Sequence, residues 1–137
     1  SCLMPLRPLI ISLSLLALAL PQAAEAAVTV RSGTLSGSQE VPANSSPGSG
    51  FALAAFDDVT NILSVQTTFA GLLGNTAAAH IHCCAPAGVN AGVATPVPSF
   101  PGFPTGVTFG SYNATFDLTL ASSFNPAFIT ANGGTVD

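Results

Sequence analysis

The clearest pattern along the chain is an alternation of apolar and polar residues, which is typical of β-strands with one buried face. It is strongest near the C-terminal end, where the apolar positions are Tyr112, Ala114, Phe116, Leu118 and Leu120. A weaker alternation over 62–69 places on one side Leu63, Val65, Thr67 and Phe69. Because successive side chains of a strand point to opposite faces of a sheet, we predict two half-buried strands here.

Three further segments predict strands: Val28–Leu35, Phe51–Phe56 and Thr76–Cys84. In the second of them, the core-facing side chains are expected to be Phe51, Leu53 and Ala55. Between two of the strands, the turn-forming residues 57–61 predict a hairpin. The 3.6-residue period of a long helix does not occur after the first 26 residues, and only a helical turn at 127–130 is expected. These short strands predict an all-β fold, an antiparallel β-sandwich.

The segment Ala85–Gly106 lacks a strand pattern, and nine of its 22 residues are glycine or proline. A loop of this length is uncommon in a compact domain and is usually functional or disordered. Its aromatic residues, Phe100 and Phe103, argue against disorder, so we expect it to fold back over one end of the sheet. The chain then reaches Asp137 without a closing strand, and the sandwich is therefore expected to be incomplete at its C-terminus.

Residues 1–26 have the order of a secretory signal peptide: a short start with Arg7, the apolar run Leu9–Leu20, and small residues before a cleavage site. The apolar run has about 12 residues, fewer than the roughly 20 that a membrane-spanning helix needs. We therefore expect an exported protein, located in the periplasm, at the cell surface or outside the cell. Its mature chain is expected not to span a membrane.

Composition excludes several classes of structure and function for the remaining domain, residues 27–137. Charged residues make up 6% of the 137-residue chain and hydrophobic residues 48%, a balance that excludes a coiled coil or a highly charged disordered chain. The formal net charge is −4, and Arg31 is the only basic residue after the signal. One arginine cannot neutralise a phosphate backbone, so the composition excludes nucleic-acid binding.

One short segment carries residues suited to metal binding: Ala79-His80-Ile81-His82-Cys83-Cys84. In a strand, His80, His82 and Cys84 would lie on one face, with neighbours about 6.5 to 7 Å apart. Two imidazoles and a thiolate suit copper or zinc. The chain has only two histidines, and a complete site needs three or four ligands. The alternative is a polar strand face whose histidines hydrogen-bond to a covering loop.

The adjacent pair Cys83 and Cys84 leaves three alternatives open. The two residues form a vicinal disulfide if the strand ends here in a turn, an alternative that an oxidising compartment permits. Otherwise they are free or metal-linked thiols, or they pair with another chain. Cys2 lies in the predicted signal peptide and is not their partner.

The sequence favours a protein without enzymatic activity. It contains no Gly-x-Ser-x-Gly elbow to place a serine for attack, and no phosphate-binding or dinucleotide-binding motif. The only adjacent carboxylates, Asp57 and Asp58, belong to the predicted hairpin turn, where solvated charge is the better interpretation.

Several motifs in combination resemble the CHRD (chordin-type) domain family. They are Leu35-Ser36-Gly37-Ser38-Gln39-Glu40-Val41-Pro42, Gly50-Phe51-Ala52, Phe69-Ala70-Gly71-Leu72, and Ala77-Ala78-Ala79-His80-Ile81-His82 before the glycine-rich loop. The resemblance runs from about residue 33 to the end of the chain. It implies an immunoglobulin-like β-sandwich, export, no established enzymatic activity, and a role in binding or surface organisation. The His-Ile-His-Cys-Cys form is similar to exported bacterial members, many of which carry a PEP-CTERM sorting signal.

The sequence thus supports three functional hypotheses. The first is an exported, non-catalytic binding or surface-organisation module with an unknown protein or extracellular matrix partner. The second is a copper- or zinc-binding sandwich that uses His80 and His82. The third is an assembly component whose exposed sheet edge pairs with another protein.

Overall fold

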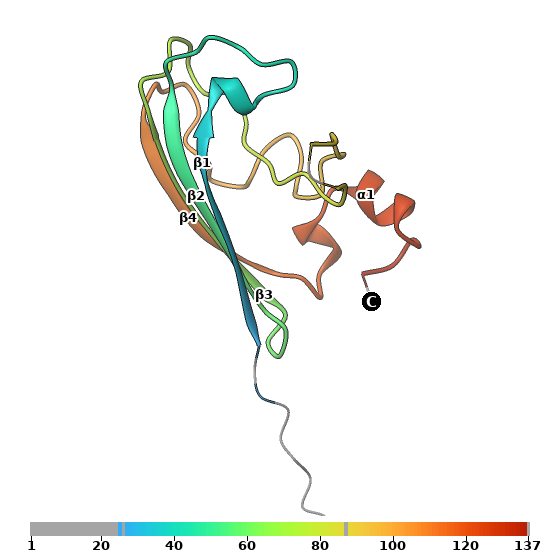
Figure 1. Ribbon diagram of the computed structural model, residues 1–137. Coiled ribbons are helices and arrows are strands. Elements are labelled where there is room, and N and C mark those ends of the chain that lie inside the picture. The colour runs from blue at the N-terminus through green and yellow to red at the C-terminus, as the bar shows by residue number, and fades with distance from the viewer. Residues whose placement is uncertain (1–24, 26, 87, 137) are drawn as a thin grey trace, which may run out of the picture.

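The computed structural model describes residues 25, 27–86 and 88–136, so the predicted signal peptide lies outside the described residues apart from Glu25. Four strands form one antiparallel sheet (Figure 1). They are β1 (Val28–Ser36), β2 (Ser49–Asp57), β3 (Ile62–Ala70) and β4 (Gly110–Asp117). Within the described part of the chain, no helix has the length and apolar character needed to cross a membrane.

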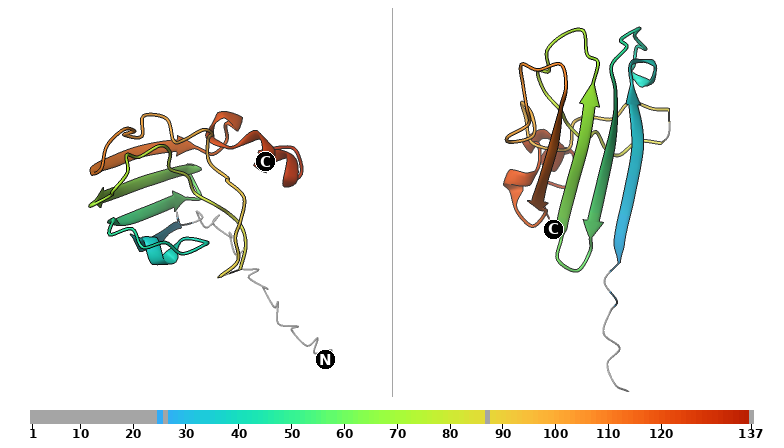
Figure 2. Two further views of the ribbon diagram at one scale, coloured as in Figure 1. Left: turned by 90° about the horizontal axis from the view of Figure 1, so that it is seen from above. Right: turned by 90° about the vertical axis from the view of Figure 1, so that its left-hand side faces the viewer.

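Each strand pairs with the next one along the chain, so β1 and β4 are the two edges of the sheet (Figure 2, right). The register aligns Ala54 of β2 with Val65 of β3, and Val65 with Ala114 of β4. Partners in an antiparallel pair lie on the same side of the sheet. We call the side that carries Val65 the inner face; it includes Arg31, Gly33 and Leu35 in β1, Ala52 and Ala54 in β2, Leu63 and Thr67 in β3, and Tyr112 and Phe116 in β4.

The long connection between β3 and β4, residues 71–109, crosses the inner face and forms the second layer of the molecule (Figure 2, left). We call it the covering segment. Its Phe100 stacks on Tyr112, with 5.6 Å between ring centroids, and lies 5.3 Å from Phe116. These contacts and Val65 form the buried core. The predicted all-β fold is confirmed and is consistent with a β-sandwich, although the predicted loop covers a face of the sheet rather than one end.

The predicted strand Thr76–Cys84 is wrong: this part of the covering segment is irregular. It is held by separate backbone hydrogen bonds, from the N–H of Ala94 to the C=O of Ile81 at 2.9 Å and from the N–H of Phe100 to the C=O of Ala79 at 3.0 Å. A regular ladder does not form because the facing stretch contains four prolines, at positions 96, 98, 101 and 104. Proline has no N–H to donate to a ladder.

The predicted facing of β2 is also wrong. Phe51, Leu53 and Ala55 lie on the outer face, and Phe51 is 46% exposed. Alternation in a strand specifies two sets of residues but not which set is buried, and a shift of one residue in the pairing exchanges them. The observed register aligns Ala54 with Val65 and so buries the set with the smaller side chains.

After β4 the chain turns back toward the covering segment. The predicted strand from Tyr112 to Leu120 ends early, at Asp117, because the Asp117 carboxylate accepts hydrogen bonds from the N–H and hydroxyl of Thr119 and so forms a turn. A short 3-10 helix, η2 (Ala121–Ser123), and the α-helix α1 (Pro126–Ala131) follow, and α1 contains the predicted helical turn. Another short 3-10 helix, η1 (Gly37–Gln39), follows β1.

Candidate functional site

A groove of about 300 Å³ separates the β1–β2 half of the inner face from the covering segment. We call it the inner groove. Ala52, Ala54 and Val65 line it from the sheet, while Ile81 and Phe100 line it from the covering segment. In the β3–β4 half of the inner face, the large side chains of β4 fill the space below the covering segment. In the β1–β2 half, the two alanine side chains are too short to fill it. The result is an open hollow with mainly apolar walls, the usual character of a ligand-binding surface.

The rim of the inner groove is β1, which is exposed along nearly its whole length. Gly33 lies at the middle of this rim, and a Cβ atom added there would meet no atom within 4 Å. Arg31 also lines the groove and is the only lysine or arginine among the described residues. Its Nη1 donates to the carbonyl of Val30 at 3.1 Å, so the guanidinium lies near the edge of the sheet.

A second cleft, of about 370 Å³, lies at the end of the sheet beside η1 and adjoins the inner groove. The two hollows share Leu35, Thr67, Ala79 and His80. This cleft is more polar, since Glu40 and Asn44 also line it. The inner groove therefore has a mainly apolar floor, with Arg31 in its lining and a more polar cleft beside it.

The two histidines lie on the same side of the covering segment, as predicted, although the segment is not a strand. Their ring centroids are 6.1 Å apart with the rings nearly perpendicular. His80 Nε2 donates to the carbonyl of Pro98 at 2.7 Å, and His82 Nδ1 donates to the carbonyl of Ala91 at 2.8 Å. Since a carbonyl only accepts, each neutral ring keeps its other nitrogen, Nδ1 of His80 and Nε2 of His82, as an acceptor.

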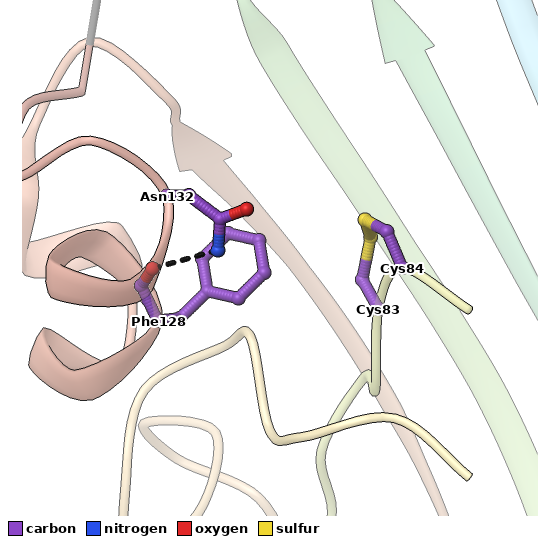
Figure 3. The surroundings of a disulfide bond; sticks show 4 residues. All are labelled: Cys83, Cys84, Phe128 and Asn132. Atoms are coloured by element: carbon purple, nitrogen blue, oxygen red, sulfur yellow. Dashed lines mark hydrogen bonds between the residues drawn. A yellow bond between two sulfur atoms is a disulfide. The ribbon is translucent and has the colours of Figure 1, made fainter.

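The third predicted metal ligand, Cys84, is bonded to Cys83 through a disulfide (Figure 3). Phe128 of α1 and Asn132, the residue that follows α1, lie in the surroundings of this disulfide, and the Nδ2 of Asn132 donates to the carbonyl of Phe128 at 2.8 Å. In the described residues, no group of three or more histidine, cysteine, aspartate or glutamate side chains is arranged to hold a metal ion. The predicted copper or zinc site at His80, His82 and Cys84 stays a prediction.

Two carboxylates, those of Asp57 and Asp117, are not part of the groove lining and stabilise turns. The backbone N–H groups of Thr60 and Val59 donate to Asp57 in the β2–β3 hairpin, and they lower the pKa of its carboxyl group. The hydroxyl and N–H of Thr119 lower the pKa of Asp117 in the same way. Burial raises the pKa of Tyr112, whose hydroxyl donates to the carbonyl of Pro101 at 2.8 Å.

Sequence reasoning did not identify the inner groove. Its signal is the pair of small residues Ala52 and Ala54 in β2 together with Gly33 in β1, but these residues mark a groove only when the facing of β2 is known. Because the larger residues of β2 were expected to be inward, the small ones were not recognised as the floor of a hollow.

The family model for the CHRD domain matches residues 31–131, which include most of β1, the other three strands, the covering segment and α1. The chain belongs to the CHRD domain family. CHRD domains are in general non-catalytic modules and are typically found in extracellular or exported proteins. No curated protein and no solved structure matches the chain.

Proposed function

We propose that this CHRD protein is an exported, non-catalytic binding module and that the inner groove is its ligand-binding surface. The observation that carries the proposal is the unequal covering of the inner face. Phe100 and its aromatic neighbours fill the β3–β4 half, whereas the alanine floor of the β1–β2 half faces an open groove of about 300 Å³. Apolar surface left open next to a few polar groups is characteristic of ligand sites.

The side chains that could serve in catalysis are engaged in hydrogen bonds within the protein, which supports a role without catalysis. Asp57 and Asp117 are occupied by hydrogen bonds from their own turns, and His80 and His82 donate to carbonyls of the covering segment. The signal-like order of residues 1–26 and the usual setting of CHRD domains support export.

The test uses 1-anilinonaphthalene-8-sulfonate, an apolar anion whose rings suit the groove walls and whose sulfonate suits Arg31. We expect saturable binding at one site of the mature protein. The variant Gly33→Val should lower the affinity about tenfold or more, because the new side chain occupies the groove. It should not lower the thermal midpoint, since the added atoms meet open space and a β-branched residue favours a strand.

The matched control is Ser64→Val, which places the same side chain on the outer face of the sheet, at a β3 position opposite Ala55 and outside the groove lining. It should leave the affinity for the probe unchanged. Equal loss of affinity in both variants, or no loss in Gly33→Val, would contradict the proposal.

The second candidate function is copper or zinc binding by His80 and His82. The specific observation in its favour is that backbone carbonyls accept from one nitrogen of each ring, at 2.7 and 2.8 Å. Metal-binding histidines commonly donate their other N–H to a carbonyl, which fixes the tautomer and the ring orientation. The Cys84 sulfur would join the site only after reduction of the disulfide.

Elemental analysis of the mature protein, made without a histidine tag in an oxidising compartment, tests this candidate. About one equivalent of copper or zinc in the protein and none in a folded His80→Ala/His82→Ala variant is the expected result. Absence of metal from both, with failure to load the protein with copper or zinc, would contradict it.

A further inference from the structure

Among the residues that the structure describes, none pairs with the outer edge of β1, which has nine residues, and the inner groove runs along the inner side of this strand. Free edges are commonly blunted by charged side chains, proline or a bulge. The β1 strand contains no proline, its register with β2 is continuous from Val28 to Ser36, and Arg31 is its one charged side chain. An edge of this kind is a ready template for another strand.

One hydrogen bond determines which backbone groups of β1 are free. The N–H of Asp58 donates to the carbonyl of Ala27 at 3.3 Å, and these residues are opposite each other when the β1–β2 register is extended by one pair. Hydrogen-bonded and non-bonded pairs alternate along an antiparallel ladder. The odd-numbered residues therefore direct N–H and C=O to β2, whereas the even-numbered ones direct theirs to the free edge: Val28, Val30, Ser32 and Thr34.

The side chain of Arg31 is consistent with this assignment. Its Nη1 donates to the carbonyl of Val30 at 3.1 Å, which requires that this carbonyl be accessible from outside the ladder. Arg31 itself lies on the inner face, two residues before the gap at Gly33 and therefore next to it on that face. A strand added at β1 would thus meet free backbone groups, an open passage into the groove and a cation.

Charge indicates what kind of strand fits. The chain carries a formal net charge of −4, so two copies repel each other, whereas Arg31 attracts a carboxylate. We propose that β1 and the inner groove together bind an extended peptide segment of another protein. The segment pairs with the β1 edge, inserts small apolar side chains past Gly33, and presents a carboxylate to Arg31. This inference rests on the proposed function, because it takes the inner groove as the ligand-binding surface.

The probe is an eight-residue capped peptide in which threonine occupies one face, and valine with one central glutamate occupies the other. We expect it to bind the mature protein with one-to-one stoichiometry. Methylating the backbone nitrogen of every second residue gives two peptides, one for each alternating set of residues, which we call the two phases. Methylation should abolish binding in one phase and leave it unchanged in the other, because only one set of N–H groups faces β1. Equal effects in both phases would overturn edge pairing. Replacing the glutamate by lysine should weaken binding, and an unchanged affinity would overturn the role of Arg31.

The variant Val30→Pro removes a free edge donor without removing a bond to β2. It should lower the peptide affinity about tenfold or more while leaving the affinity for anilinonaphthalene sulfonate unchanged. The matched control is Thr115→Pro in β4. The N–H of Leu118 donates to the carbonyl of Asn61 at 2.9 Å, so the even-numbered residues of β4 pair with β3 and the N–H of Thr115 points to the opposite edge of the sheet. Equal loss in the two variants, or none in Val30→Pro, would overturn the inference.

Amide hydrogen exchange distinguishes a peptide of another protein at the β1 edge from another part of the same polypeptide and from a second copy of the protein. In the protein alone, the N–H groups of the even-numbered residues 28–34 should exchange rapidly, and the peptide should protect them. If they are already protected in a monomer, another part of the same polypeptide fills the edge; if protection increases with protein concentration, a second copy does. Either result overturns the inference, but the proposed function survives it if the dye still binds and Gly33→Val still removes that binding.

Discussion

Side-chain volume divides the inner face into two halves with different roles. In the β3–β4 half, Tyr112 and Phe116 pack against Phe100, which is only 5% exposed. In the β1–β2 half, Ala52 and Ala54 leave the space that forms the inner groove. Stability and binding therefore depend on different residues of one sheet face.

Phe100→Ala should lower the free energy of unfolding by about 3 kcal/mol, because it removes a buried ring and leaves a cavity between Tyr112 and Phe116. Denaturant titration measures the change. Phe109→Ala is the control: Phe109 is 71% exposed, so its loss should change stability by less than about 0.5 kcal/mol. Similar losses for both variants would show that Phe100 is not the central contact of the core.

The pH dependence of stability should arise largely from Asp57 and Asp117. Their hydrogen bonds lower the pKa of each carboxyl group in the folded state, so the unfolded chain binds protons more readily. The stability that they contribute is fully present above the unfolded pKa of about 4 and is lost as the pH falls through the lower folded values. An Asp57→Asn/Asp117→Asn variant should therefore lose less stability than the parent protein between pH 5 and pH 3, in unfolding measured by circular dichroism. An equal loss would contradict this account.

The alternation of residues predicted which side chains face inward in β3 and β4, but not in β2. In β3 and β4, large and polar residues alternate, so that the inward positions Val65 and Tyr112 could be recognised. In β2, both alternating sets are apolar, and the larger set with Phe51 lies outside because the register with β3 selects the smaller one. That choice depends on pairing between strands, which a single strand does not specify.

The covering segment is the element that makes the sheet a two-layered domain. It has no ladder of its own, so side chains satisfy its backbone: Thr95 Oγ1 accepts from the N–H of Ile81, and Ser99 Oγ accepts from the N–H of Ala79, both at 2.9 Å. At its far side, the N–H of Asn125 donates to the carbonyl of Ala94 at 2.8 Å. These bonds position Ile81 and Phe100 as the outer wall of the inner groove.

Thr95→Val keeps the shape of a buried side chain, 6% exposed, but removes the acceptor for the Ile81 N–H. The unsatisfied N–H should cost about 1 to 3 kcal/mol of stability and should increase hydrogen exchange in the covering segment more than in β3. Thr115→Val, on the exposed outer face of β4, is the matched control and should have little effect. A Thr95→Val protein as stable as its parent would contradict the role assigned to this bond.

Among the elements, four strands, the β2–β3 hairpin and the helical turn of α1 could be predicted from the sequence. The strand predicted at Thr76–Cys84 could not form because its partner stretch is rich in proline, and partners are set by the tertiary fold. The same alternation nevertheless placed His80 and His82 on one side, since extended backbone alternates its side chains even without a ladder.

At the scale of the whole molecule, one sheet and one irregular layer diverge toward β1 and leave the inner groove open. The motifs that resemble CHRD domains were sufficient to predict the family and the all-β class. They were not sufficient to predict the groove, because it depends on the facing of β2 and on the path of residues 71–109.

The most direct test of the inner groove as a binding surface is mapping of chemical shifts in isotope-labelled mature protein during titration with anilinonaphthalene sulfonate. The largest changes should occur at Arg31–Leu35, Ile81 and Phe100, with little change at Phe51 and Thr68 on the outer face. Changes centred on the outer face, or spread evenly over the sheet, would contradict the assignment of the inner groove as the ligand-binding surface.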